Sequence, residues 1–266
     1  MALLAPPAAR AEVRTAIDVT AFQVSVAPIS GGSTPGVSFA GAGGSTSTCE
    51  VIFGRPSSDR SVTSSSASAF GQVSSALDGG PDVGGAATLA GDFFGAGGEV
   101  HATAWAVGAG ADATGQATIG LVNGVSDAMF TLAPGTRMTI TAYVSATAWV
   151  SGASAGEIAD SGLSMTVADA SGTGPQFARV TFDAFAMGLF GPWEDDESTV
   201  LSLVYENDTD APITGLFSGY VASYAFAPDP VSAVPEPAAA AMLPAGIALA
   251  LAVALARRRS RDRARP

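Results

Sequence analysis

The sequence predicts an all-β outer domain, an antiparallel β-sandwich of jelly-roll-like form, followed by a single C-terminal transmembrane helix. Segments in which apolar or β-branched residues alternate with polar ones recur along the chain, separated by turns rich in Gly, Ser and Asp. A long uncharged run lies at residues 238–256. The 266 residues, with 13 Phe, 3 Trp and 4 Tyr, suffice for one such domain with an aromatic core.

Side-chain alternation indicates about nine or ten strands and no convincing helix before residue 238. Arg137–Val150 has the clearest pattern and is long enough to bend or to serve two sheets. Asn123-Gly124 is typical of a two-residue hairpin turn, and Asn207–Asp210 is expected to form another turn. The expected strands are Thr15–Val26, Glu99–Val107, Thr114–Val122, Ser126–Leu132, Arg137–Val150, Leu163–Val167, Phe177–Met187, Thr199–Tyr205 and Ile213–Phe226.

Two Gly-rich segments, Gly31–Gly44 and Gly79–Gly98, are expected to form flexible surface loops. Their glycines follow no phosphate-binding spacing and no helix is expected after them, which argues against a nucleotide site. The tripeptide Asn207-Asp208-Thr209 matches the acceptor sequence for N-glycosylation, a match that we interpret as accidental.

Charge is distributed unevenly along the chain. Residues 1–256 contain 23 acidic residues and 6 Arg, a net charge of −17, whereas residues 257–266 contain 6 Arg and one Asp. An outer domain this acidic repels phosphate backbones and anionic lipid. We therefore expect no nucleic-acid partner.

Residues 1–11 (MALLAPPAARA) have features of the end of a secretory signal peptide. Ala9-Arg10-Ala11 fits the small-x-small pattern at which such peptides are cleaved. A basic start and a full apolar region do not precede it, so we expect a remnant whose true start lies upstream. The alternative is that these residues are no signal, and the expectation of export depends on this choice.

The C-terminal residues combine a Pro-rich spacer, an uncharged span and an Arg cluster. Prolines keep residues 228–237 extended. Residues 238–256 would measure about 28 Å as a helix, close to one hydrocarbon core. The basic tail at 257–266 stays cytoplasmic, which places residues 12–227 outside as the β-sandwich domain. The stop signal consists of Arg257, Arg258, Arg259 and Arg261.

The uncharged span is poorly suited to permanent anchoring. Ten of its 19 residues are Ala, and Pro244 and Gly246 interrupt the helix. With so few strongly apolar residues, insertion gains only a few kcal/mol. We therefore interpret the span as a transient stop-transfer element, with an ordinary single-pass anchor as the alternative.

Val234, Pro235, Glu236 and Pro237, followed by the span and the Arg cluster, resemble the PEP-CTERM sorting signal of Gram-negative bacteria. The resemblance is confined to residues 234–265 and depends on three features in fixed order. It implies a protein that is held in the cell envelope and then displayed at the cell surface or released. It also implies recognition and cleavage by an integral membrane exosortase, and a link to exopolysaccharide and biofilm matrix.

Few groups are available for catalysis or for zinc. His101 and Cys49 are the sole His and Cys, and the chain has no Gly-x-Ser-x-Gly motif. Neither a nucleophilic triad nor a zinc site is therefore expected. We expect no enzyme activity and no cofactor. Cys49 is interpreted as a small buried side chain, with a reactive thiol as the alternative.

Four consecutive acids after Pro192-Trp193 form an expected loop and are candidate calcium ligands, because hard cations take several carboxylate oxygens. The regular spacing of an EF-hand loop is absent, so a solvated acidic turn is the favoured interpretation. The four residues are Glu194, Asp195, Asp196 and Glu197.

Three functions remain open for the outer domain. A non-enzymatic surface or matrix protein is favoured. A carbohydrate-binding sandwich would expose Trp105, Trp149 or Trp193, and a glycan-acting enzyme would need two convergent carboxylates in a cleft. The tetrapeptide Ala-Thr-Ala-Trp occurs at 102–105 and 146–149, through duplication or chance, and we expect its two Trp to pack in the core.

Overall fold

The computed structural model describes residues 10–29, 34–40, 44–53, 59–68, 72–78, 82–92, 97–108, 110–119, 121–122, 125–126, 128–170, 177–189 and 191–228. Contacts divide the chain into two units, Met1–Asp229 and Pro230–Pro266, and every described residue belongs to the first. The expected sorting motif, membrane span and Arg cluster lie outside the described residues. Within the described ranges, no helix is long and apolar enough to cross a membrane.

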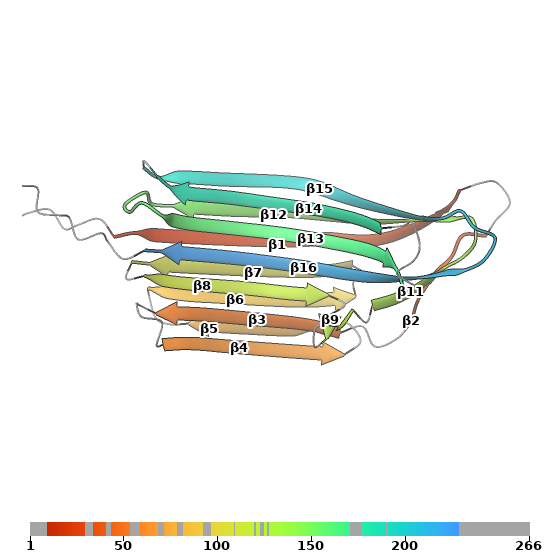
Figure 1. Cartoon of the computed structure of the whole chain (residues 1–266), viewed down its shortest axis with the longest axis horizontal. Helices are drawn as coiled ribbons and strands as arrows, with labels where there is room; N and C mark the ends of the chain where they lie inside the picture. The colour runs from red at the N-terminus through yellow and green to blue at the C-terminus, as the bar shows by residue number, and fades with distance from the viewer. Residues whose placement is uncertain are drawn as a thin grey trace, which may run out of the picture. The chain divides into compact units, whose positions relative to one another are not determined.

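The described residues form two main antiparallel sheets, here called sheet A and sheet B (Figure 1). The strands of sheet A, in spatial order, are β15 (Trp193–Asn207), β12 (Thr136–Val150), β1 (Glu12–Pro28), β7 (Gly97–Val107), β6 (Val83–Asp92) and β5 (Val73–Asp78). Sheet B contains β14 (Phe177–Gly188), β13 (Glu157–Asp169), β16 (Ile213–Ala227), β8 (Ala111–Ile119), β3 (Gly44–Phe53) and β4 (Asp59–Ser68). In addition, β11 (Ala128–Leu132) pairs with β16, and β2 (Val37–Ala40) pairs with β11.

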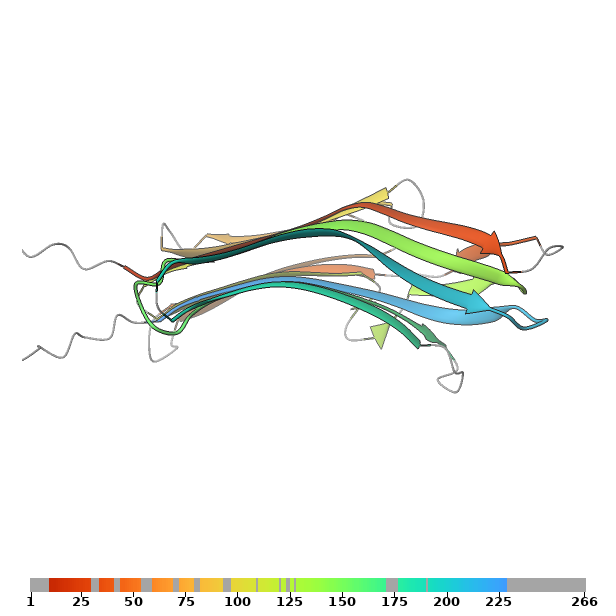
Figure 2. The same cartoon turned by 90° about the horizontal axis from the view of Figure 1, so that it is seen from above.

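The two sheets pack face to face, so the predicted all-β class and antiparallel sandwich are confirmed for the described residues (Figure 2). Their strands follow the same order, with β15 over β14, β1 over β16, β7 over β8 and β5 over β4. The longest strands contain 15 to 17 residues, well above the usual five or six. Each sheet is therefore built of long antiparallel strands whose axes are nearly aligned.

The nine expected strands all lie within observed strands or overlap them, but five strands, β2 to β6, were missed. The missed strands β3, β4, β5 and β6 are rich in Ser, Ala and Gly, which carry little strand propensity. The expectation that Gly79–Gly98 is a flexible loop is wrong for most of its length, because Val83–Asp92 forms β6 between two partner strands. Similarly, Gly31–Gly44 contains β2. Arg137–Val150 serves sheet A alone.

The expected hairpin at Asn123-Gly124 is smaller than predicted. Leu121–Val122 (β9) pairs with Val125–Ser126 (β10), while the two turn residues lie outside the described residues. The flanking strands do not pair with each other. Instead β8 and β11 pair with successive parts of the same edge of β16, and the short β9–β10 hairpin connects them.

Small side chains let the two backbones touch in the middle of the sandwich. A Cβ atom added to Gly115 of β8 would lie 2.4 Å from the carbonyl oxygen of Ala86 and 2.6 Å from that of Thr103, both in sheet A. Across the interface, a Cβ on Gly85 would lie 3.0 Å from the Thr114 carbonyl oxygen. The sheets therefore approach more closely than side-chain packing normally allows.

Aromatic residues fill one end of the interior. Phe22 packs edge-on against Phe217 with ring centroids 6.0 Å apart, and Phe130 packs on Tyr205 at 5.7 Å. A bulge in β1 places Phe22 inward, because the register with β12 shifts after Thr20 and Ala21 adopts a φ of 51°. The core is thus divided into an alanine-rich part and an aromatic part.

Three buried hydroxyl groups link the sheets within the alanine-rich part, where Ser223 pairs with Gly115. Ser223 Oγ of sheet B donates to the Ala102 carbonyl oxygen of sheet A at 2.9 Å and lies 3.1 Å from Ser161 Oγ. The Ser161 hydroxyl in turn contacts the Thr15 hydroxyl of β1. Each hydroxyl is almost fully buried, so these polar groups satisfy one another's hydrogen-bonding capacity inside the core.

Two turn-forming polar residues are also fully buried. Glu157 accepts hydrogen bonds from the backbone N–H of Gly152 and of Ser154, both at 2.8 Å, and so closes the β12–β13 connection. Asn207 Nδ2 donates to the Leu132 and Ala211 carbonyl oxygens at 2.9 Å. The expected turn at Asn207–Asp210 is confirmed, and the amide nitrogen of its sequon is committed to backbone.

Substitution of Gly115 by Ala is expected to destabilise the domain by about 2–3 kcal/mol, because the methyl group collides with backbone of the facing sheet. Urea unfolding of the full chain measures this effect. Gly162→Ala is the matched control, since its Cβ would meet only the Phe182 carbonyl oxygen at 3.4 Å. Equal stability of the two variants would contradict the close approach of the sheets.

Removal of one buried hydroxyl by Ser161→Ala is expected to cost about 1–3 kcal/mol, because it leaves its hydroxyl partners unsatisfied. The free energy of urea unfolding is again the measurement. Ser164→Ala, three residues along the same strand on the outer face, should change it by less than about 0.5 kcal/mol. A neutral Ser161→Ala would show that the hydroxyl chain does not stabilise the sandwich.

Candidate functional site

The outer face of sheet B carries a hollow of about 460 Å³. In Figure 2 the strands of this sheet arch so that the outer face is concave. The hollow lies over β14, β13, β16 and β8, in the middle of the sheet. We call it the Tyr hollow and define it by Asp160, Gly162, Asp183, Tyr220, Ala222 and Tyr224.

Alternation along two central strands builds the Tyr hollow. Gly162 of β13 pairs with Ala222 of β16, and these two small residues form its floor. Tyr220 and Tyr224 stand on either side of Ala222 on the same strand face, about 13 Å apart along the strand. The Tyr220 hydroxyl donates to Gln116 Oε1 of β8 at 3.3 Å. The aromatic walls are therefore held by a rigid strand.

Two carboxylates share one side of the Tyr hollow. Asp160 pairs with Tyr224 on one neighbouring strand, and Asp183 of β14 lies diagonally across on the other. Burial, and then the nearby charge of Asp183, raise the pKa of Asp160 above its usual value. Burial, and then Asp160, raise the pKa of Tyr220. A group that accepts hydrogen bonds is thus placed beside each Tyr ring.

A third acid, Asp112, lies beyond Tyr224. Burial, and then the charge of Glu50, raise the pKa of Asp112 in β8. Burial, and then Asp112, raise the pKa of the Tyr224 hydroxyl. At the opposite side of the hollow, Arg179 Nε donates to Ser164 Oγ at 3.2 Å. The site therefore offers aromatic faces, several hydroxyl and carboxylate groups, and one cation.

The two Ala-Thr-Ala-Trp segments flank one strand in sheet A. Trp105 of β7 and Trp149 of β12 both pair with Arg14 of β1, one on each side. Both Trp are half-buried on the outer face, so the expectation that they pack in the core is wrong. Trp105 lies over Gly84, where an added Cβ would be 2.1 Å from its ring. We call Trp105, Arg14 and Trp149 the Trp row.

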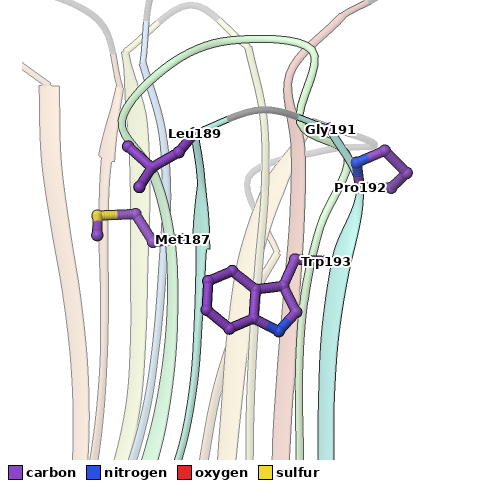
Figure 3. A pocket seen from close by; sticks show the side chains of 5 residues that line it. All are labelled: Met187, Leu189, Gly191, Pro192 and Trp193. Atoms are coloured by element: carbon purple, nitrogen blue, oxygen red, sulfur yellow. The ribbon is translucent and has the colours of Figure 1, made fainter.

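Trp193 lies at one edge of the sandwich and is 49% exposed. Figure 3 shows its indole directed toward the side of Met187, in an apolar pocket of about 270 Å³ that also involves Leu189, Gly191 and Pro192. This pocket offers apolar contact and few polar groups.

The four acids proposed as calcium ligands do not form a loop. Glu194, Asp195, Asp196 and Glu197 lie in the first half of β15, where successive side chains point to opposite faces. Asp195 Oδ2 accepts the backbone N–H of Phe185 in β14 at 2.9 Å. Among the residues that the structure describes, no three His, Cys, Asp or Glu side chains gather as metal ligands would.

The remaining candidate residues are distributed widely. His101 Nδ1 lies 2.5 Å from Asp18 Oδ1 on the outer face of sheet A, away from the Tyr hollow. Cys49 lies in β3, and its side chain is outside the described part of the chain. The residues Val234–Pro237 and the Arg cluster are likewise outside it.

Sequence analysis missed the Tyr hollow, although a local signal was present. Tyr220 and Tyr224 occupy the face of β16 opposite Phe217 and Val221, which are buried. Two aromatic residues on the non-core face of a strand therefore marked an exposed aromatic surface.

No known protein-family model matches the chain, and no curated protein matches it at a significant level.

Substitution of Asp160 by Asn is expected to stabilise the domain near neutral pH. Because the folded pKa is raised, the native state holds the proton more tightly, and stability falls as pH rises from about 3.9 through the folded pKa. The penalty is complete above that range and absent below it. The melting temperature should therefore rise at about pH 7 and change little at about pH 3.

The control for this substitution is Glu194→Gln, which removes an exposed acid on another strand. The size of the Asp160→Asn effect is limited by the exposure of the carboxylate to water. Equal shifts of the melting temperature at both pH values would contradict the assigned proton linkage.

Proposed function

We propose that this chain is an exported bacterial surface or extracellular-matrix protein, sorted through a PEP-CTERM-like signal, whose outer domain is not an enzyme. The observation that carries the proposal is the order of Val234–Pro237, the uncharged span and the Arg cluster at the end of the sequence. The proposed partner is an exosortase-type membrane enzyme. In this proposal the span forms a single transmembrane helix before sorting.

The described residues support a passive outer domain. The last strand, β16, ends at Ala227, directly before the Pro-rich residues that would carry the cleavage site. An extended, proline-containing segment outside a folded domain is accessible to a processing enzyme. The domain itself is a long sandwich with an acidic sequence, suited to remain soluble at a cell surface.

Carbohydrate binding is a second candidate for the same domain, and it agrees with a link to exopolysaccharide. The outward position of Trp105 and Trp149 and the exposure of Trp193 favour it, because these rings are not confined to the core. The Tyr hollow adds two further exposed aromatic residues beside carboxylates. A glycan-acting enzyme is the third candidate, since Asp160 and Asp183 share that hollow.

Replacement of Pro235, Glu236 and Pro237 by Ala is expected to leave the chain unprocessed in the membrane fraction. Deletion of residues 257–266 should abolish both the retention of the chain in the membrane and its processing. Cell fractionation, with mass spectrometry of the mature chain, measures both results in the native host.

Pro228→Ala with Pro230→Ala is the matched control, because it alters the adjacent proline pair and leaves the motif intact. Replacement of Arg257, Arg258, Arg259 and Arg261 by Lys preserves the charge and should preserve sorting. If the motif variant has the location and mass of the wild-type chain, the sorting proposal fails.

A further inference from the structure

We propose that the Tyr hollow on the outer face of sheet B binds a short segment of an uncharged polysaccharide without cleaving it. The proposal rests on the proposed function in one respect, since export would place the domain beside extracellular polysaccharide. The ligand class follows from four properties of the hollow: its aromatic walls, its floor, its hydrogen-bonding groups and its charge.

The aromatic walls provide apolar contact for sugar rings. Tyr220 is 41% exposed, and Tyr224 is half-buried on the same face of β16. The C–H face of a pyranose is apolar and packs on an aromatic ring, while its hydroxyl groups remain at the rim. Two Tyr residues whose Cα atoms are about 13 Å apart along one strand suit an extended chain that contacts each ring with a different sugar unit.

The floor leaves room for the ligand between these rings. Gly162 and Ala222 pair directly, so a methyl group is the largest side chain at this level of β13 and β16, and Gln116 of β8 borders the floor on the other side of Ala222. No steric requirement of the fold explains Gly162, because an added Cβ would make only one ordinary contact, with the Phe182 carbonyl oxygen. The strands of sheet B also arch, so that the outer face is concave along them (Figure 2).

The hydrogen-bonding groups match hydroxyls, which both donate and accept. Asp160 and Asp183 accept hydrogen bonds, and the guanidinium of Arg179 donates them. Asp160 is held on β13 directly beside Tyr224, so a sugar stacked on that ring would present its hydroxyl edge to a carboxylate. This combination of a stacking surface and adjacent carboxylates recognises polyhydroxylated rings.

The charge of the hollow selects against acidic polymers. Two carboxylates are present with one Arg, and Asp112 and Glu50 add negative charge beyond Tyr224. A polyuronate or phosphate-bearing glycan would bring like charges together, which costs free energy and weakens association. An uncharged polymer avoids this cost and retains every hydrogen bond.

Affinity electrophoresis of the purified full chain tests the proposal, in a detergent without a sugar headgroup. The probes are dextran, hydroxyethylcellulose and soluble starch as neutral polymers, with alginate as the anionic comparison. At least one neutral polymer should retard the wild-type chain, and alginate should not. Calorimetric titration with the matching hexasaccharide then gives the affinity.

Four variants locate the binding site. Gly162→Leu fills the floor and should abolish retardation. Tyr220→Ala and Tyr224→Ala should each weaken binding about tenfold, the ratio expected for one aromatic contact, and Tyr220→Phe should retain it. Circular dichroism and urea unfolding confirm that each variant is folded.

Trp149→Ala provides the matched control, since it removes an outward aromatic residue from the opposite sheet. It should bind like the wild-type chain. Loss of binding in this variant alone would assign the ligand to the Trp row and overturn the proposal.

Absence of retardation by every neutral polymer, or preferential binding of alginate, would also overturn it. If the wild-type chain released new reducing ends from a polymer and Asp183→Asn did not, the hollow would be a catalytic site and the proposal of binding without cleavage would be wrong. Because binding is measured on purified protein, its failure is distinguishable from a failure of sorting, which is read from location and mass in the cell.

Discussion

The direct contact between the backbones of the two sheets is the constraint on which this domain depends. Gly115 approaches the carbonyl oxygens of Ala86 and Thr103 so closely that no side chain fits between them. Most neighbouring inward positions are alanine, so this part of the interior gains little from large apolar side chains. Stability there comes from extended strand pairing over 15 to 17 residues and from the buried hydroxyls of Thr15, Ser161 and Ser223.

A thin interior also determines what the outer faces carry. In a strand of alternating residues, alanine on the inner face leaves the outer face as the place for bulky rings. Trp105 and Trp149 follow this pattern in sheet A, beside the inward Ala104 and Ala148. In sheet B, Tyr220 and Tyr224 also lie on the outer face, where their inward neighbours are Gly219, Val221, Ser223 and Ala225. Two separate aromatic surfaces therefore lie on opposite sides of one sandwich. Packing in the core does not explain these aromatic residues. Their position on the outer faces is therefore evidence for ligand-binding surfaces.

The sequence predicted those elements in which alternation and propensity agree. Arg137–Val150 has alternating apolar positions, and it forms a strand of almost the predicted length. By contrast, β6 is built from Gly, Ala and Thr, and its strand state depends on β5 and β7 on either side. The first half of β15 contains four acids, which resemble a loop in the sequence but gain backbone pairing with β12. Partner strands supply what local propensity lacks.

The candidate site was predictable only in part, for a similar reason. The spacing of Tyr220 and Tyr224 on the outer face of β16 follows from the sequence. Their proximity to Asp160 and Asp183 depends on the register between β16, β13 and β14, which no local pattern encodes. The meaning of the repeated Ala-Thr-Ala-Trp segments likewise appeared only with the register, since both pair with the same residues of β1.

The contact between Asp195 and the Phe185 backbone has a consequence for crowded surroundings. β14 and β15 form one edge of their sheets, with β4 and β5 at the other, and long edges invite strand addition by other chains. Asp195 occupies a donor that such a chain would need, and neighbouring acids on β15 add repulsion. At high protein concentration, the occupied donor and the negative charge make this pair of edges a poor template for strand addition. The acidic run thus acts against fibre growth and lets the domain remain a discrete particle.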